Sequence, residues 1–193
     1  MLSSASMVFA SEGQPTINRD DEIITNTTNT IANNPNDAIA YCKRANAYSN
    51  KNNYDLAISD YNKAIEINPK YSFAYACKAY MHSKQGEYNS AINDFSKAIE
   101  YNSSYELAYI NRGMIYIRIR EHDLAISDFN KAIGINSKNI SSYFGLGLAC
   151  EEKALYQEAI NAFNKLILNA TLPQDKDLVD SAKLHILKLG GAL

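Results

Sequence analysis

One short block of sequence recurs along this chain at a fixed interval. The block AISDYNKAIEINP begins at Ala57, and related blocks begin in equal steps at Ala91, Ala125 and Ala159. Within each block an alanine, an aromatic residue and isoleucines are spaced three and four residues apart, which places them on one stripe of a helix. A fixed period of about 20 to 50 residues is typical of stacked repeats rather than of a single globular core. The sequence therefore predicts an array of similar helical units.

A second helical segment precedes each block, and it carries an aromatic residue followed four positions later by a small one. A ring beside a small side chain lets two helices approach closely, so each unit is predicted to be a helical hairpin. Few prolines and glycines interrupt these segments, which favours an all-α chain. The aromatic residues are Tyr41, Tyr75, Tyr109 and Tyr143, and the small ones are Ala45, Ala79, Gly113 and Gly147.

This arrangement resembles the tetratricopeptide repeat family, whose unit of about 34 residues equals the interval from Ala57 to Ala91. The resemblance covers Ala38 to Pro173 and implies an all-α, right-handed superhelical solenoid of helical hairpins. The proline that ends the family's unit is present as Pro69. Elsewhere Ser103, Ser137 and Thr171 replace it, so we expect Ser or Thr capping of the next helix, or solvated backbone, at those turns. The predicted units are residues 38–71, 72–105, 106–139 and 140–173.

The two ends of the array are predicted to be capped. Residues 22–35 align with the repeated block as a degenerate half-repeat, which predicts an N-terminal cap helix. Residues 174–189 have acids early, lysines late and glycines after them, which predicts a C-terminal capping helix. Residues 1–21 fit neither pattern and are either a disordered tail or the remnant of a signal peptide. The protein would be exported if residues 1–10 are such a remnant, and cytoplasmic otherwise.

Composition and motifs exclude several classes of function. The 19 basic and 21 acidic residues give a net charge of −2, so the dense cationic face of a nucleic-acid binder is not expected. No apolar run is long enough to span a membrane. We find no phosphate-binding glycine loop, zinc-binding histidine pair or nucleophile motif. His82, His122 and His185 fall in different segments, and the cysteines are scattered. We therefore expect no enzymatic activity, cofactor or metal.

The resemblance places a concave groove on the first helices of the units. Helical projection shows that the side chains facing it are mainly apolar from the second unit onward. Monomeric soluble proteins rarely leave a large apolar patch bare, so we expect a partner protein or peptide to bind there. The predicted partner-binding residues are Ile39, Phe73, Ala76, Tyr80, Leu107, Ile110, Met114, Ile117, Phe144 and Leu148.

One other way of using the groove is not expected, and two alternatives to partner binding remain open. Some relatives hold the acidic tail of a chaperone with Lys, Asn and Arg, but only one Asn matches at the corresponding places, so no such clamp is expected. The groove could instead be filled by the chain's own C-terminal helix or by another copy, as in a self-assembling protein. Its side chains could also pack between neighbouring first helices. The places of the clamp are Cys42, Asn46, Cys77, Leu107 and Asn111.

Overall fold

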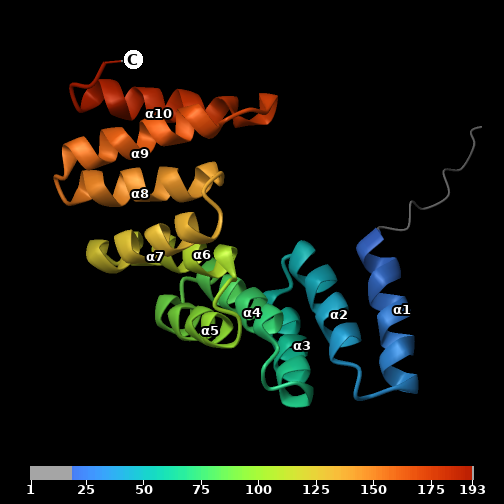
Figure 1. The fold of residues 1–193 in the computed structure, drawn as a ribbon. Helices are drawn as coiled ribbons and strands as arrows, with labels where there is room; N and C mark the ends of the chain where they lie inside the picture. Colours follow the sequence, from blue (N-terminus) through green and yellow to red (C-terminus); the bar gives the residue numbers. More distant parts are fainter. Residues whose placement is uncertain (1–18, 193) are drawn as a thin grey trace, which may run out of the picture.

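Residues 19–192 form a curved stack of antiparallel helices in the computed structural model (Figure 1). The residue range 1–21 assigned to a tail or signal remnant lies largely outside this described part. The helices are α1 (Arg19–Asn33), α2 (Ala38–Asn50), α3 (Tyr54–Ile67), α4 (Ser72–Lys84), α5 (Tyr88–Tyr101), α6 (Glu106–Arg118), α7 (His122–Ile135), α8 (Ile140–Glu152), α9 (Tyr156–Asn169), the short 3-10 helix η1 (Pro173–Asp175) and α10 (Lys176–Lys188).

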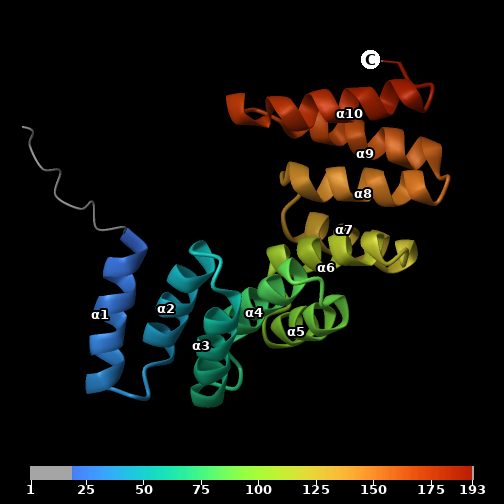
Figure 2. The same cartoon turned by 180° about the vertical axis from the view of Figure 1, so that it is seen from behind.

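The stack is built from four hairpins that contact only their neighbours. The hairpins are α2–α3, α4–α5, α6–α7 and α8–α9, and each second helix also packs on the first helix of the next hairpin. The first helices α2, α4, α6 and α8 contact one another in order, while α1 packs on α2 and α10 on α9. Figure 2 shows the same order from behind, with α1 and α10 at opposite ends. The predicted all-α solenoid fold is confirmed, and its core is distributed along the stack.

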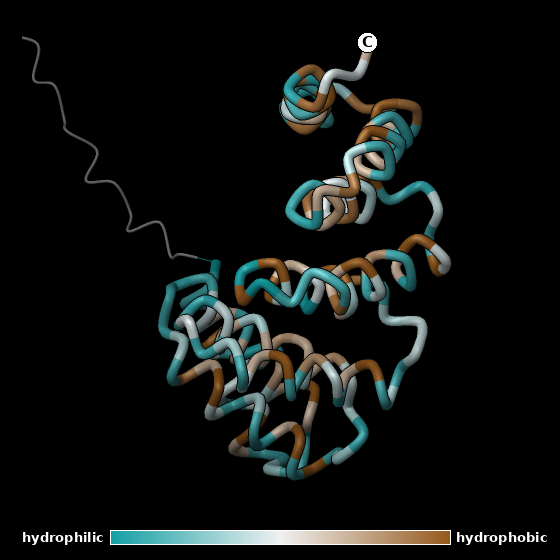
Figure 3. Tube along the Cα trace, turned by 90° about the vertical axis from the view of Figure 1, so that its left-hand side faces the viewer, coloured by the Kyte–Doolittle hydropathy of each residue, from teal (hydrophilic) through white to brown (hydrophobic). Residues whose placement is uncertain are grey.

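Each unit buries the aromatic residue of its second helix. Tyr61, Phe95, Phe129 and Phe163 are at most 1 % exposed. Short hydrophilic and hydrophobic stretches alternate along the helices in Figure 3, as expected for amphipathic helices that bury one stripe. The small residues of the first helix make room for the ring, because a Cβ added at Gly147 would lie 2.5 Å from the Phe163 ring. The pairing of ring and small residue therefore sets the approach of the two helices.

The turn inside each hairpin contains one residue in the left-handed conformation. These residues occupy the same place in each unit and have φ between 58° and 80°. The amide of the following residue donates to the carbonyl five positions back, for example Leu155 N to Cys150 O at 2.9 Å, which is the Schellman motif of helix C-termini. Only one of the four is glycine, although glycine adopts this conformation most readily. The four residues are Asn52, Gly86, Arg120 and Ala154.

Asparagine forms the turn between units, and the expected capping by Ser103 and Ser137 is not found. The Oδ1 atoms of Asn68, Asn102 and Asn136 accept from the amide two residues on, at 3.1 to 3.3 Å. Helices α4 and α6 have no side-chain cap, and α8 is capped by Asn139, so neither Ser103 nor Ser137 caps the helix that follows it. An asparagine side chain can mimic a backbone turn in this way, so proline is not required.

Candidate functional site

A pocket of about 250 Å³ lies among the first helices of the first three units. We refer to it as the apolar pocket. Phe73, Ala76 and Tyr80 of α4 and Leu107 of α6 form much of its wall, and Tyr61 and Phe95 of the second helices close its floor. Phe73, Tyr80 and Leu107 are 37 %, 42 % and 55 % exposed, whereas Ala76 is buried. The structure thus brings four of the predicted binding residues together around one hollow.

Two asparagines add polar groups at the edge of the apolar pocket. Asn46 accepts from the Tyr61 hydroxyl at 2.6 Å through Oδ1, which leaves its Nδ2 group to donate. Asn111 donates through Nδ2 to the carbonyl of Leu107 at 2.8 Å, which leaves its Oδ1 to accept. One donor and one acceptor beside an apolar surface suit the backbone of an extended peptide, which carries both groups.

A second hollow of about 530 Å³ adjoins the apolar pocket, and the two share Tyr80 and Asn111. We refer to it as the polar hollow. It lies at the C-terminal ends of α4 and α6, where Lys84 and Arg118 line it together with Met114. Lys84 lies over the Tyr80 ring at 5.1 Å from its centroid. Interaction with the Tyr80 hydroxyl raises the pKa of Lys84, and the like charge of Arg118 acts in the opposite direction.

The other predicted groove residues do not line the apolar pocket. Ile110 is only 7 % exposed and lies in the core cluster with Phe129, so it is a core residue and does not face the groove. Met114 and Ile117 are partly buried against that cluster, because first helices also contact one another. Ile39 is exposed in a separate hollow beside α1.

Phe144 and Leu148 are partly buried against the C-terminal cluster of α8, α9 and α10. The Phe144 ring lies 5.9 Å from that of Phe163 and 6.2 Å from that of His185. Helix α10 extends the stack beyond α9, and none of its residues is among those that line the apolar pocket. Glu151 ties α10 to α8, since it lies 2.6 Å from His185 Nδ1 and accepts from Lys188 at 2.7 Å. Within residues 19–192, then, the apolar pocket is not filled by the C-terminal helix.

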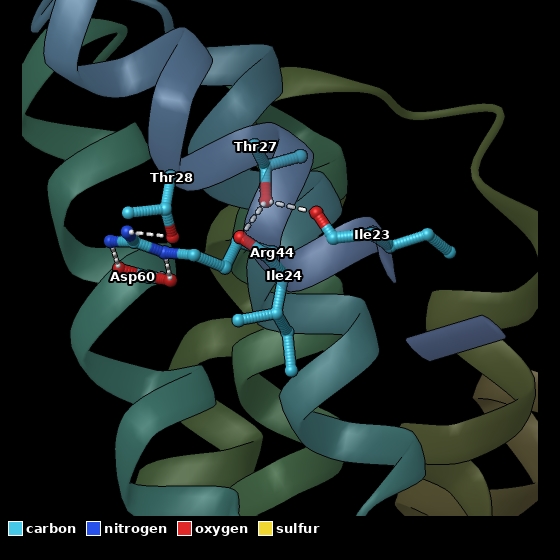
Figure 4. Close-up of polar contacts among 6 residues, drawn as sticks. All are labelled: Ile23, Ile24, Thr27, Thr28, Arg44 and Asp60. Atoms are coloured by element: carbon cyan, nitrogen blue, oxygen red, sulfur yellow. Dashed lines mark hydrogen bonds and ion pairs between the residues drawn. The ribbon is translucent and has the colours of Figure 1, made fainter. Parts of the chain in front are cut away.

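A ladder of ion pairs, which the sequence patterns did not predict, runs beside the core of the first three units. The Arg44 guanidinium donates twice to Asp60, at 2.7 and 2.8 Å, and once to Thr28 of the preceding helix at 3.1 Å (Figure 4). Arg112 contacts Asp128 and Ser96 in the same way. In the second unit Lys78 lies 3.1 Å from Asp94 and 3.2 Å from Asn62. Each cation therefore joins three consecutive helices.

Burial raises the pKa of all three cysteine thiols. All three are free thiols, and burial is the first cause that raises the pKa of Cys42 to about 12 and that of Cys77 to about 11. These two thiols are therefore protonated near neutral pH, where a reactive cysteine would be ionised. The described residues hold no cluster of three or more metal-ligating side chains. None of the helices described is long and apolar enough to cross a membrane.

Comparisons with known proteins match most of the chain. Family models described as "Tetratricopeptide repeat" match residues 38–71, 60–93, 107–139 and 140–169, and one described as "TPR repeat" matches 79–119. The predicted resemblance is confirmed by these matches. No curated protein sequence matches the chain.

Several solved structures share the fold. The crystal structure of MamA protein has a TM-score of 0.72 at 27 % identity and covers 80 % of this chain and 89 % of its own. YrrB, described as a TPR protein with an unusual peptide-binding site, has a TM-score of 0.70 at 22 % identity, and the match covers 84 % of this chain and 82 % of YrrB. The first TPR domain of Spaghetti, solved with an HSP90 peptide, has a TM-score of 0.59 at 22 % identity and covers 61 % and 93 %. At 22 % identity the last two show the fold alone.

Proposed function

Because the chain belongs to the tetratricopeptide repeat family, we propose that it is a non-enzymatic scaffold that binds an extended segment of a partner protein in the apolar pocket. The observation that carries this proposal is the group of exposed apolar side chains around one hollow, namely Phe73, Tyr80 and Leu107. Aromatic and aliphatic side chains around a hollow are the usual anchors of a peptide interface.

The size and chemistry of the apolar pocket favour a peptide over a small molecule. At about 250 Å³ it is smaller than the range of about 300 to 1,000 Å³ that is usual for small-molecule sites. Asn46 and Asn111 offer a donor and an acceptor to a peptide backbone beside it. YrrB is described as having a peptide-binding site, and Spaghetti was solved with a bound peptide, so solenoids of this shape can take peptides.

The test is selection of a phage-displayed random dodecapeptide library against the full chain, followed by Leu107→Glu in the apolar pocket. We expect the selected peptides, made synthetically and labelled, to bind the variant at least tenfold more weakly by fluorescence anisotropy. A charge placed in an apolar contact loses its hydration without gaining a partner, which accounts for the loss. The library and the peptides are fully defined probes, so the result does not depend on a cell extract.

Leu124→Glu is the matched control. Leu124 is a similarly exposed leucine on α7, and the corresponding residue of the fourth unit is already a glutamate, Glu158. We expect this variant to bind like the wild type. Recovery of no peptide from the library, or equal binding by both variants, contradicts the proposal.

Self-assembly is the alternative function, and one observation favours it. Large apolar side chains are exposed at the C-terminal end of the stack, where a second copy could cover them. Sedimentation velocity of the wild type and of Leu184→Glu with Leu187→Glu tests it, since a dimer that the double variant abolishes supports self-assembly. A monomer at all accessible concentrations eliminates it. These side chains are Leu168, Leu172, Leu184 and Leu187.

A further inference from the structure

Two cations face the polar hollow without a carboxylate partner. Lys84 ends α4 and Arg118 ends α6, and both line the hollow. Within residues 19–192 neither forms an ion pair, and the charged group that acts on Lys84 is Arg118, which repels it. Two like charges held beside one hollow, with no anion between them, create an attractive place for a negative group.

The cations that directly follow the first helices of the first and fourth units have carboxylate partners, unlike Lys84 and Arg118. Lys51, which follows the first helix of the first unit, pairs with Asp21, and Lys153, which follows that of the fourth, pairs with Asp123. Among the described cations in the last turn of a first helix or directly after it, the two unpaired ones are therefore Lys84 and Arg118, and they belong to the second and third units, which build most of the apolar pocket.

Compensation of the helix dipole does not account for these two cations. A cation in the last turn of a helix is favourable. However, the residues that correspond to Lys84 and Arg118 in the first and fourth units are Asn50 and Glu152. A stack that folds with a neutral and an acidic residue at this position does not need a cation there.

We propose that the polar hollow binds a carboxylate of the partner segment, so that the partner is a peptide with an acidic group close to an apolar anchor. This inference rests on the proposed function, because the two hollows share Tyr80 and Asn111 and would hold one peptide. Lys84 and Arg118 supply the charge. Met114 and the Tyr80 ring provide apolar surface between the acidic group and the anchor.

The distance between the hollows sets the spacing of the two groups in the peptide. Cys77 lines the apolar pocket, and Lys84, two helical turns further along α4, lines the polar hollow. A helix rises about 1.5 Å per residue, so the two lie about 10 Å apart. An extended chain spans at most about 3.3 to 3.6 Å per residue. The acidic group is therefore expected about three residues from the apolar anchor.

The test compares acidic and amide forms of one peptide on the full chain. Peptides recovered from the dodecapeptide library are synthesised with an amidated C-terminus, and their acidic residue is replaced by the corresponding amide. We expect the wild type to bind the acidic form about three- to tenfold more tightly, and the preference to disappear in Lys84→Gln with Arg118→Gln. Raised salt should weaken the acidic form selectively, since exposed charges are screened.

Lys131→Gln with Lys165→Gln is the matched control. It removes the same charge from exposed lysines on the second helices α7 and α9, and we expect the acidic preference to persist. Melting temperatures of both double variants check that the fold is intact. A second set of peptides, with a free C-terminus and no acidic side chain, tests whether a terminal carboxylate binds as well as a side-chain carboxylate. Binding of these peptides assigns the polar hollow to the C-terminus of the partner.

The outcomes separate this inference from the proposed function. Peptides that bind through Leu107 but show no acidic preference, or whose preference survives in the Lys84 and Arg118 variant, overturn the carboxylate site and leave the scaffold function standing. Peptides that bind Leu107→Glu as tightly as the wild type overturn both the carboxylate site and the proposed function.

Discussion

The first three units and the fourth hold their two helices together by different side chains. In units one to three a cation on the first helix pairs with a buried aspartate on the second, as in Arg112 and Asp128. In the fourth unit the same two positions are Leu146 and Ala162, and Ala162 is buried. The backbone pattern of helix, turn and helix continues unchanged through both.

This difference shows that the ion pair is one of two ways to fill the same place. An apolar pair avoids the cost of removing two charges from water, and replacing a buried ion pair with apolar residues is often neutral or stabilising. A bidentate pair fixes the relative position of the two helices more narrowly, because both hydrogen bonds must be satisfied at once. We therefore expect the bidentate pairs of the first and third units to contribute more to helix alignment than to net stability.

The largest loss of stability is expected when a single charge, without a partner, is introduced into the fourth unit. Ala162→Asp places a carboxylate at a buried position opposite Leu146, where the rest of the ladder has an arginine or lysine. We expect the free energy of unfolding to fall by about 3 kcal/mol, because a buried charge without a partner keeps its desolvation cost. Urea denaturation measures the change.

Adding Leu146→Arg to Ala162→Asp should recover most of that loss, since it copies Arg112 and Asp128 into the fourth unit. A double-mutant cycle gives the coupling directly. Independent, additive effects of the two substitutions would contradict the view that the positions are equivalent along the stack.

The reverse exchange in the third unit is expected to have a smaller effect. Asp128→Ala alone leaves Arg112 without its carboxylate and should cost about 2 kcal/mol, discounted because the Arg112 side chain is 17 % exposed. Asp128→Ala with Arg112→Leu copies the fourth unit and should lie within about 1 kcal/mol of the wild type. Denaturation curves with equal slopes would show that the fold is kept. A double variant that is less stable than the wild type by about 2 kcal/mol or more would show that the ion pair itself stabilises the unit.

The pH dependence of stability should have opposite signs for a carboxylate of the fourth unit, Glu151, and one of the second unit, Asp94. Burial acts to raise the pKa of Glu151, but hydrogen bonds from Lys188 and His185 outweigh it and hold the pKa below the ordinary value of 4.5. Glu151 therefore contributes stability above about pH 4.5 that is lost as the pH falls through its folded pKa. Glu151→Gln should cost about 1 kcal/mol at pH 7 and less at pH 3, as measured by melting at each pH.

Asp94 in the second unit should show the opposite sign. Burial raises its pKa from 3.8, and Lys78 and His82 offset this only in part. The ionised form is disfavoured in the folded state, so the stability contributed by Asp94 falls as the pH rises from the ordinary pKa through the raised one. The free energy of unfolding of Asp94→Asn, relative to that of the wild type, should therefore be lower at low pH than at neutral pH. The same pH trend for Asp94→Asn and Glu151→Gln would refute the contrast.

The smallest effect is expected at the left-handed turns. Ala154 and Arg120 have φ of 58° and 65°, which costs a residue with a Cβ about 1 kcal/mol relative to glycine. Ala154→Gly and Arg120→Gly should each stabilise by about 0.5 kcal/mol, because the greater freedom of glycine in the unfolded chain offsets part of the gain. Gly86→Ala should destabilise by a similar amount. Melting temperature measures all three, and a loss of stability in Ala154→Gly would show that its turn is not strained.

The repeated aromatic positions made the fold predictable from the sequence. Tyr61 and the rings at the same place in the later units are the buried centre of each unit, and the paired small residues face them. The ladder was equally periodic, since Arg44, Lys78 and Arg112 occupy the same place in successive units, yet the pairing was missed. A charged residue on a helix is normally read as solvent-facing, and only the packed hairpin brings position 44 against position 60.

The candidate site was predictable only in part. Helical projection places Leu107 and Ile110 on one face, but Leu107 is exposed in the pocket while Ile110 is buried in a cluster that joins α7 of its own unit to α8 of the next. The face of a first helix is shared between the groove and the next first helix, and the division depends on the angle between units. Tyr105 also lines the pocket, and it lies in a turn that helical projection does not cover.

The ladder has a consequence for how the length of the array can change. Each cation finds its carboxylate within its own unit, and the group it contacts in the preceding helix is neutral, as with Thr28, Asn62 and Ser96. The ladder of each unit is therefore electrically balanced within that unit. Duplication or loss of one whole unit leaves no charge of the ladder without its partner at the new junction, so the ladder itself does not restrict the number of units.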